Sequence, residues 1–507
     1  MFVGLDLGTS GTKAVVFNEE GKIIESSHKE HDMLFPQKGY IELNPEDIWQ
    51  EVRHVLKNIS SKIKYSERIK ALSISSFGEA FVPITHKGEV LHNSILATDI
   101  RGEEEINILV EKLSEDKIVE ITGLPISPTY SISKMLWLKN NRYDIYKKVW
   151  KFLLYQDFIF YKLCGKIISD YSLASRTMAL DIGKRCWSEE ILDVAGIDQD
   201  LLPKIDVAGS IVDKISQKVA SDLGLPESLL LVLGGHDQPC CALGAGAISQ
   251  GSAVDSMGTT ECITLILEDR LKNNVIKEYG FPNEPFINKN SYNTMAYLHT
   301  AGVLLKWFMN TFAEMEKVTF LKDSKVIYSY FDEISPEPPS KLFILPYFAG
   351  TGTPHMDTGA KGAIIGLTLE TKREDIYLAF LEGIAFDIQN NIKCLEQSGI
   401  ILNKLYAVGG GSKAKKWLQM KSDISEKEIS TLECNEAGAL GAAILAAKAV
   451  CIFDNLKAAV KSMVKVKDTF YPDKKTREIY KEKFQQFGKL YQNIKETNSF
   501  IANQQKS

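Results

Sequence analysis

The sequence has few of the features that direct a chain to a membrane, to the cell exterior or onto nucleic acid. No apolar run is long enough to cross a bilayer, and the first residues carry neither the basic stretch nor the long apolar stretch of a secretory signal. The eight cysteines have no regular spacing for disulfides or zinc, so we expect reduced thiols. A net charge of -5 at pH 7 argues against nucleic acid as a partner, because phosphate backbones select basic surfaces. We therefore expect a cytoplasmic protein that binds neither membrane nor nucleic acid.

The length of the chain and a repeated pattern within it predict two domains. A chain of 507 residues exceeds what one hydrophobic core usually serves. Short β-rich runs alternate with helical patterns, such as the helix start predicted at Asn44-Pro45, and this alternation is typical of the α/β class. A strand, a turn with Gly8-Thr9-Ser10 and a second strand open the chain, and the same order recurs around Gly258-Thr259-Thr260. Two copies half a chain apart indicate an internal duplication.

The same pattern places the domain boundaries. We expect an N-terminal domain at residues 1–246 and a C-terminal domain at 247–455, joined where small residues suit a hinge. The remaining segment, 456–507, is expected to be a helical tail packed on the body of the protein. Its apolar side chains recur at the spacing of an amphipathic helix: Tyr480, Phe484, Phe487, Tyr491 and Ile494.

The first motif that carries chemistry runs from Asp6 to Lys13. A hairpin rich in glycine and hydroxyl groups can point backbone N–H and side-chain O–H groups at phosphate oxygens. Lys13 adds a positive charge, and Asp6 could hold Mg²⁺ through water. The alternative is a tight hairpin whose turn simply needs glycine. The motif is not a Walker loop, because the sequence has no G-x-x-x-x-G-K-[ST].

Two further glycine motifs follow strands. In Gly234-Gly235-His236-Asp237-Gln238, an acid exposed at a strand end could take the proton of a substrate hydroxyl as it attacks a γ-phosphate. The alternative is a helix-capping aspartate, and we assign no role to His236. At residues 407–412 a strand enters a glycine triplet, which lets a ligand approach the backbone at a helix N-terminus.

Together and in this order, the motifs resemble the FGGY family of carbohydrate kinases. The resemblance covers the chain from residue 4 to about residue 447 and includes four further segments: 38–49, 127–137, 362–383 and 436–443. Thr129 and Phe380 depart from the family signatures within them. The resemblance implies two duplicated actin-like ATPase domains of the ribonuclease H-like type, with a cleft between them. It also implies ATP and Mg²⁺ as cofactors and a small sugar as the substrate.

The resemblance implies site residues by position. Asp237 matches the catalytic base and Gln238 its substrate-binding neighbour, while Asp6 is expected to hold the metal. The expected nucleotide-binding residues are Thr9, Ser10, Lys13, Gly258, Thr259, Gly302, Gly410, Gly411, Ser412 and Lys415. The expected sugar-binding residues are Glu79, Asp99 and Arg101.

The roles of the expected sugar-binding residues and the identity of the sugar leave alternatives open. Glu79 falls where glycerol kinases place a glutamate and xylulokinases a histidine, and Ala97 replaces a tryptophan of the family. Glu79 could instead be a surface carboxylate, and Asp99 with Arg101 a structural ion pair. We expect a ketopentose kinase. A glycerol or tetritol kinase, an autoinducer-type signal kinase, a non-phosphorylating ATPase and a sugar sensor remain alternatives, and we leave a homodimer open.

Overall fold

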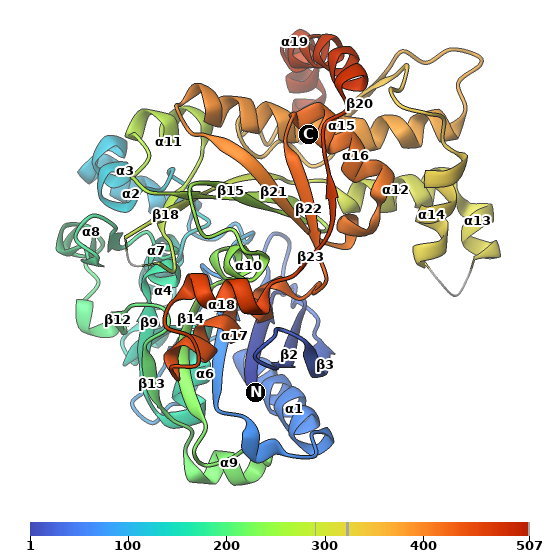
Figure 1. Ribbon diagram of the computed structural model, residues 1–507. Helices are drawn as coiled ribbons and strands as arrows, with labels where there is room; N and C mark the ends of the chain where they lie inside the picture. Colours follow the sequence, from blue (N-terminus) through green and yellow to red (C-terminus); the bar gives the residue numbers. More distant parts are fainter. Residues whose placement is uncertain (289, 321–323, 505–507) are drawn as a thin grey trace.

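The computed structural model describes residues 1–288, 290–320 and 324–504 (Figure 1). Two mixed β-sheets lie one above the other in this view, and helices α10 (Asp237–Ala245) and α17 (Ala437–Ala449) lie between them. Each sheet is the centre of one domain.

The N-terminal sheet has six strands with the first hairpin near one edge. Its order is β13 (Ile211–Lys214), β14 (Leu230–His236), β5 (Ala71–Ser76), β1 (Phe2–Gly8), β2 (Gly11–Phe17) and β3 (Ile23–Glu30). One face packs on α1 (Pro45–Lys62), α6 (Tyr155–Cys164) and α9 (Gln217–Leu223). The predicted start of α1 is confirmed, because the Asn44 side chain accepts a hydrogen bond from the Glu46 N–H.

The C-terminal sheet has seven strands. Its order is β17 (Asn283–Pro285), β18 (Tyr292–Leu298), β16 (Glu261–Leu267), β15 (Gly251–Met257), β21 (Leu402–Gly409), β22 (Glu428–Leu432) and β23 (Val466–Phe470). The largest hydrophobic core joins this sheet to α12 (Gly302–Phe312), α15 (Arg373–Gln397) and α16 (Lys415–Ser425).

The two sheets repeat one topology. In each, an antiparallel hairpin (β1–β2 or β15–β16) pairs its first strand in parallel with a later strand, β5 or β21. A second parallel strand and an antiparallel edge strand follow on that side in both sheets. The predicted α/β class and the duplication into two actin-like domains are confirmed.

Shorter elements surround the sheets. Five two-stranded pairs join β4 (Glu42–Leu43) to β7 (Ser94–Ile95), β6 (Phe81–Ile84) to β8 (Lys151–Leu154), β9 (Ile168–Asp170) to β12 (Lys204–Asp206), β10 (Leu180–Asp181) to β11 (Cys186–Trp187) and β19 (Phe343–Leu345) to β20 (Ala363–Ile365). The other helices before the last segment are α2 (Glu103–Leu113), α3 (Glu115–Thr122), α4 (Ser131–Asn141), α5 (Tyr143–Tyr146), α7 (Tyr171–Ser175), α8 (Glu189–Ala195), α11 (Asn273–Tyr279), α13 (Glu314–Thr319) and α14 (Ser324–Ile334), with 3₁₀ turns at Ser66–Arg68, Gln199–Leu201 and Gly410–Lys413.

Helices α10 and α17 cross where glycine allows their backbones to touch. A Cβ atom on Gly244 would lie 1.9 Å from the carbonyl oxygen of Ala437, and one on Gly441 would lie 1.9 Å from that of Cys240. Helix α17 covers the sheet of the other half of the chain, because it packs on Phe2 and other apolar residues of the N-terminal sheet. Helix α10 packs on both sheets, since Cys240 and Leu243 lie in the same cluster as Phe2, while Ala242 and Ala245 lie in a cluster that includes residues of β15 and β16.

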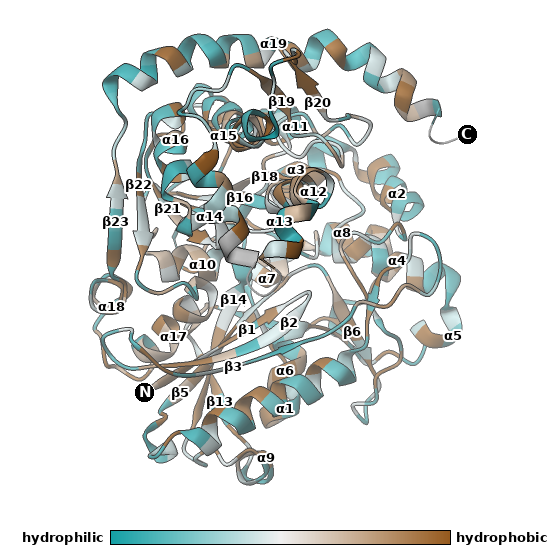
Figure 2. Cartoon of the chain, turned by 90° about the vertical axis from the view of Figure 1, so that its right-hand side faces the viewer, coloured by the Kyte–Doolittle hydropathy of each residue, from teal (hydrophilic) through white to brown (hydrophobic). Residues whose placement is uncertain are grey.

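The last segment is not purely helical, which differs from the expectation for 456–507. It contains α18 (Leu456–Met463), then β23, which pairs with β22 as an edge strand of the C-terminal sheet, then α19 (Lys474–Gln504). Figure 2 shows α19 lying across the C-terminal domain. Its apolar side chains Tyr480, Phe487 and Tyr491 pack against Phe386 and neighbours, as an amphipathic helix does. Within the described ranges, no helix combines the length and the apolar character needed to cross a bilayer.

Candidate active site

The first hairpin presents the polar side chains that the sequence assigned to phosphate. Thr9 and Ser10 are exposed at the turn between β1 and β2. Lys13 on β2 lies opposite Asp6 on β1, and its Nζ is 2.7 Å from Oε2 of Glu436. Because Glu436 directly precedes α17, this ion pair joins the hairpin to the other half of the chain.

Asp6 is half-buried on the first strand of the hairpin. The Ser75 hydroxyl donates a hydrogen bond to its Oδ1 at 2.6 Å. Loss of solvent around the carboxylate, together with the negative charge of Asp237, raises the pKa of Asp6 to about 6 against the effect of this bond. A Cβ atom on Gly438 would lie 3.1 Å from Oδ1 of Asp6, so the glycine leaves room beside the carboxylate.

Asp237 is the first residue of α10 and directly follows β14. The two preceding glycines lie inside β14 rather than in a turn. A Cβ on Gly234 would lie 1.8 Å from the carbonyl oxygen of Ile74, so the glycine allows β14 to approach β5 closely. The Asp237 side chain is 36% exposed, so it can meet a substrate. Burial raises the pKa of Asp237, while His236, whose Nε2 is 3.2 Å from Oδ1, opposes that rise.

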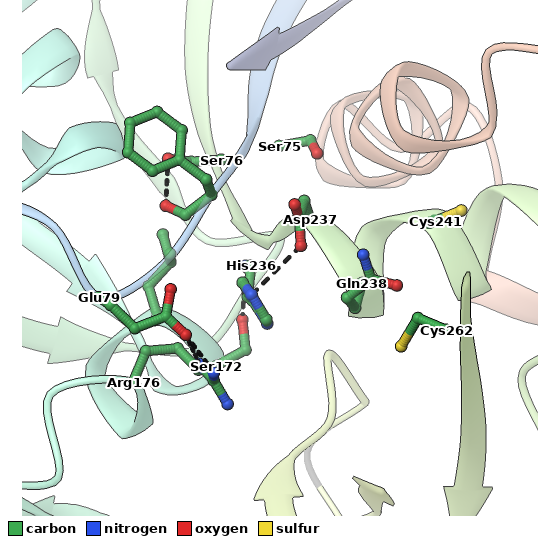
Figure 3. Close-up of polar contacts among 12 residues, drawn as sticks. Ser75, Ser76, Glu79, Ser172, Arg176, His236, Asp237, Gln238, Cys241 and Cys262 are labelled. Carbon is green, nitrogen blue, oxygen red and sulfur yellow. Dashed lines mark hydrogen bonds and ion pairs between the residues drawn. The ribbon is translucent and has the colours of Figure 1, made fainter. Parts of the chain in front are cut away.

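Glu79 lies in the interior, and the surface alternative is wrong for it. Its side chain is 11% exposed, and Arg176 Nε donates to its Oε1 at 2.7 Å. Its backbone has a φ of +62°, a left-handed conformation that costs a residue with a Cβ about 1–2 kcal/mol. The Ser131 hydroxyl, which donates to the Glu79 carbonyl, helps to hold this conformation. In Figure 3 the side chains of Glu79, Arg176, His236 and Asp237 gather in one region.

Asp99 and Arg101 form the structural ion pair that the sequence left as an alternative. Arg101 donates to both oxygens of Asp99, at 2.8 and 2.6 Å, and to Glu42 Oε1 at 2.7 Å. The side chains of Asp99 and Arg101 are 0% and 2% exposed, and the Ile41 N–H donates to Asp99 Oδ2. Protein partners therefore occupy the groups that the family resemblance assigned to the sugar. Lys134 lies beside this pair and donates hydrogen bonds to the carbonyl oxygens of Pro128, at 2.5 Å, and Arg101, at 3.3 Å.

Gln238 joins the two domains beside Asp237. Its Oε1 accepts a hydrogen bond from Thr264 Oγ1 on β16 at 3.3 Å. Cys241 on α10 and Cys262 on β16 lie near it in Figure 3. The amide therefore stands at the junction of the domains, where a substrate between them would reach it.

Five of the predicted nucleotide-binding residues line one cavity of about 660 Å³. They are Gly258, Thr259, Gly302, Gly410 and Gly411. The Gly302 N–H donates to the Gly258 carbonyl at 3.0 Å, and a Cβ on Gly302 would lie 2.5 Å from that oxygen, so only glycine fits. The volume suits a drug-sized or nucleotide-sized ligand.

The structure places the other two predicted adenosine-site residues outside this lining. Ser412 donates to the Gly409 carbonyl at 2.8 Å, which closes the glycine turn. The Lys415 side chain is 74% exposed and lies 3.6 Å from Asp468. Lys413 lines the cavity instead. The remaining wall is largely apolar and was not foreseen from the sequence: Leu305, Tyr328, Tyr377, Leu381 and Trp417.

Sequence reasoning also missed three charged residues, two of them beside Glu79 and the third beside Lys13 of the hairpin. Arg176, at the end of α7, lies between Glu79 and Glu284 of β17, and it pairs with both carboxylates. Glu436 was noted within a family segment but received no role. Arg176 and Glu284 stand in no glycine motif, so no signal in the sequence pointed to them.

The residues around Asp6 fit a magnesium ion that is shared with a nucleotide. Within the described residues, no three His, Cys, Asp or Glu side chains form a ready metal cluster. Mg²⁺ keeps several waters and usually takes one or two carboxylates plus phosphate oxygens, so a single acid suffices. Asp237 and Glu436 both raise the pKa of Asp6, which shows a concentration of negative charge that a cation would relieve.

Comparisons with known proteins define the class. Residues 1–244 match the model of the N-terminal domain of the FGGY family of carbohydrate kinases, and residues 253–450 match that of its C-terminal domain. The chain is 30% identical over 506 residues to the xylulose kinase of Bacillus subtilis, covering 100% of this chain and 99% of the relative. It is also 30% identical over 464 residues to the gluconokinase of that organism, covering 90% and 89%.

A solved structure agrees in fold. The ligand-bound xylulose kinase from Lactobacillus acidophilus superimposes with a TM-score of 0.89 at 23% identity over 99% of both chains. Fold and matches together define a phosphotransferase that acts on carbohydrates. The chain belongs to the FGGY family of carbohydrate kinases, so it is a sugar kinase that uses ATP.

Proposed function

We propose that the protein transfers the γ-phosphate of ATP to a hydroxyl of a ketopentose, with Asp237 as the general base. The observation that carries this proposal is the partly exposed Asp237 carboxylate at the start of α10, which interacts electrostatically both with Glu79 and with Asp6 of the phosphate hairpin. The xylulose kinase relative supports the substrate class.

The chain's own groups supply positioning and charge. Thr9, Lys13 and Thr259 hold the phosphates, and the cavity beside Gly410 takes the adenosine. Asp6 would hold Mg²⁺ through water, and the bound ion would neutralise charge on the phosphate oxygens. Asp237 accepts the proton of the attacking sugar hydroxyl. Domain closure keeps water away from the transferred phosphate.

The charge of the sugar side favours an uncharged sugar over an acid such as gluconate. Arg176 pairs with Glu79, and both arms of its guanidinium are occupied, one by Glu79 and the other by Glu284. A carboxylate on the substrate would therefore meet two buried carboxylates beside a guanidinium that is already paired. The xylulose kinase and gluconokinase relatives are both 30% identical to the chain, over 506 and 464 residues, and the charges beside Glu79 favour the substrate class of the xylulose kinase.

A sugar panel tests the proposal. ADP release is measured with D-xylulose, D-ribulose, glycerol, erythritol and D-gluconate, and without sugar. We expect a ketopentose to give the highest kcat/KM and gluconate to give a rate near the sugar-free control. A rate that is highest with glycerol, erythritol or gluconate, or that no sugar increases, contradicts the ketopentose assignment.

A further inference from the structure

A row of buried ionisable side chains connects the C-terminal domain to the sugar-binding residues proposed above. Glu284 lies on β17, the edge strand of the C-terminal sheet, and its side chain is 0% exposed. Its Oε1 pairs with Nη1 of Arg176, and its Oε2 is 3.7 Å from Nδ1 of His236. The Asn293 amide also donates to Oε2, at 3.4 Å. One carboxylate therefore faces two groups of the N-terminal domain, the Arg176 guanidinium and the His236 imidazole, which is a cation when protonated.

Each of these groups holds a residue of the proposed mechanism. Arg176 donates to Glu79 through Nε at 2.7 Å and through Nη2. The Nε2 atom of His236 is 3.2 Å from Oδ1 of Asp237 (Figure 3). The backbone N–H of His236 also donates a hydrogen bond to Ser172 Oγ at 2.9 Å, which fixes the backbone just before α10.

The electrostatics agree with this geometry. Burial would raise the pKa of Glu284, but Arg176 and His236 hold it at about 2. Burial would lower the pKa of His236, but the carboxylates of Asp237 and Glu284 outweigh burial and the repulsion of Arg176, so the pKa is raised. Asp170 also faces this imidazole. A protonated His236 then donates to Asp237 and favours its charged form.

We propose that Glu284 is a positioning residue of the sugar site. Through it the C-terminal domain positions two residues of the N-terminal domain: Glu79, which Arg176 contacts, and Asp237, which His236 contacts. The proposal rests on the proposed function for the roles of Glu79 and Asp237. Contact between the domains then completes the sugar site, because the C-terminal domain supplies the negative charge of Glu284, which orders Arg176 and His236.

The test compares Glu284→Gln with a contact elsewhere in the same interface. Lys277 on α11 pairs with Asp116 on α3, so this pair also joins the two domains, but its Asp116 side chain is 77% exposed. Lys277→Ala is therefore the matched control. Steady-state constants are measured for ATP and for D-xylulose, or for whichever uncharged sugar the panel shows to be turned over fastest, together with the pH profile of kcat.

We expect Glu284→Gln to lower kcat/KM for the sugar by at least about tenfold, with the KM for ATP nearly unchanged. Without Glu284, His236 loses its proton at lower pH and no longer favours the charged Asp237, so the acid limb of kcat should move to higher pH. Lys277→Ala should keep the wild-type constants and the wild-type acid limb.

A second variant keeps the proposal testable if Glu284→Gln fails to fold, which circular dichroism will show. His236→Gln removes the contact to Asp237 and leaves Arg176 paired with Glu79. We therefore expect a lower kcat and the same shift of the acid limb, with the KM for the sugar near the wild-type value. An unshifted acid limb in His236→Gln, or a Glu284→Gln enzyme that matches Lys277→Ala, overturns the proposal. Turnover of a sugar other than a ketopentose would contradict only the proposed function, since the same comparison is then made on that sugar.

Discussion

At the scale of single residues, Asp237 stands where an acid can act both as a base and as a helix-terminal charge. It begins α10, where a negative charge is favoured by the helix dipole, and its side chain still reaches solvent. The helix-capping alternative is wrong for Asp237, because the N-cap residue of α10 is His236 and Asp237 is the first residue inside the helix. A change to asparagine tests the role as a base, because an amide keeps the size of the side chain but cannot accept the proton.

We expect Asp237→Asn to lower kcat by about 100- to 10,000-fold, the usual contribution of a general base. ATP binding, measured by calorimetry, should stay near wild type, because the nucleotide cavity is lined by residues of the C-terminal domain. A variant that retains full turnover would exclude Asp237 as the base.

Local motifs predicted the residues that glycine turns present, and they missed residues that only the fold brings together. Gly258 and Gly410 stand in glycine motifs and Gly302 was expected only from the family resemblance, and all three line one cavity. Arg176 and Glu284 are 108 positions apart and meet only because β17 lies at the sheet edge nearest to α7. No spacing within a single segment can show such a pair. The same holds for Arg101, whose partner Glu42 lies 59 positions away.

At the scale of elements, the two glycine-rich helices α10 and α17 allow the halves of the chain to touch. The strand and helix pattern predicted both hairpins and the start of α1, because periodicity and capping are local signals. It missed β23, a short strand between α18 and α19, because an edge strand is defined by its pairing with β22 rather than by its own five residues.

We expect Gly441→Ala to lower the free energy of unfolding by about 1–3 kcal/mol, because the new Cβ would lie 1.9 Å from the Cys240 carbonyl oxygen. Gly488→Ala in α19 is the matched control, since no atom lies within 4 Å of its added Cβ. Alanine favours a helix over glycine by up to about 1 kcal/mol, so the control should be neutral or more stable. Denaturant unfolding that gives equal stabilities for the two variants would contradict the close approach of the helices.

At the scale of the whole molecule, stability should depend on buried acids whose pKa values are raised. Three buried aspartates show this clearly: Asp157, Asp170 and Asp387. Each holds its proton more tightly in the folded state than in the unfolded chain, where the usual value is 3.8. Their contribution to stability is therefore fully present below about pH 4 and is lost as the pH rises through the folded values.

Asp387 allows the cleanest test, because it lies on α15 away from the proposed site. Burial raises its pKa to about 7, although the Tyr347 hydroxyl donates to it at 3.1 Å. Asp387→Asn mimics the protonated acid, so we expect it to match the wild type below about pH 4, where the acid is protonated in both states. As the pH rises from 4 to 7 the variant should become more stable than the wild type, by on the order of 1–4 kcal/mol. A stability difference that stays constant between pH 4 and pH 7 would show that Asp387 does not titrate in this range.

Because α17 covers the N-terminal sheet and α10 packs partly on the C-terminal sheet, neither half is a self-sufficient folding unit. If the chain were cut between residues 246 and 251, the N-terminal fragment would expose Phe2, Phe17 and Val232, which α17 covers in the intact protein. The cut pieces should aggregate alone and recover when mixed, as complementing fragments do. A single copy of this repeat would meet the same need by swapping its helix with a second copy, so the duplicated chain is equivalent to a domain-swapped dimer whose subunits have been fused.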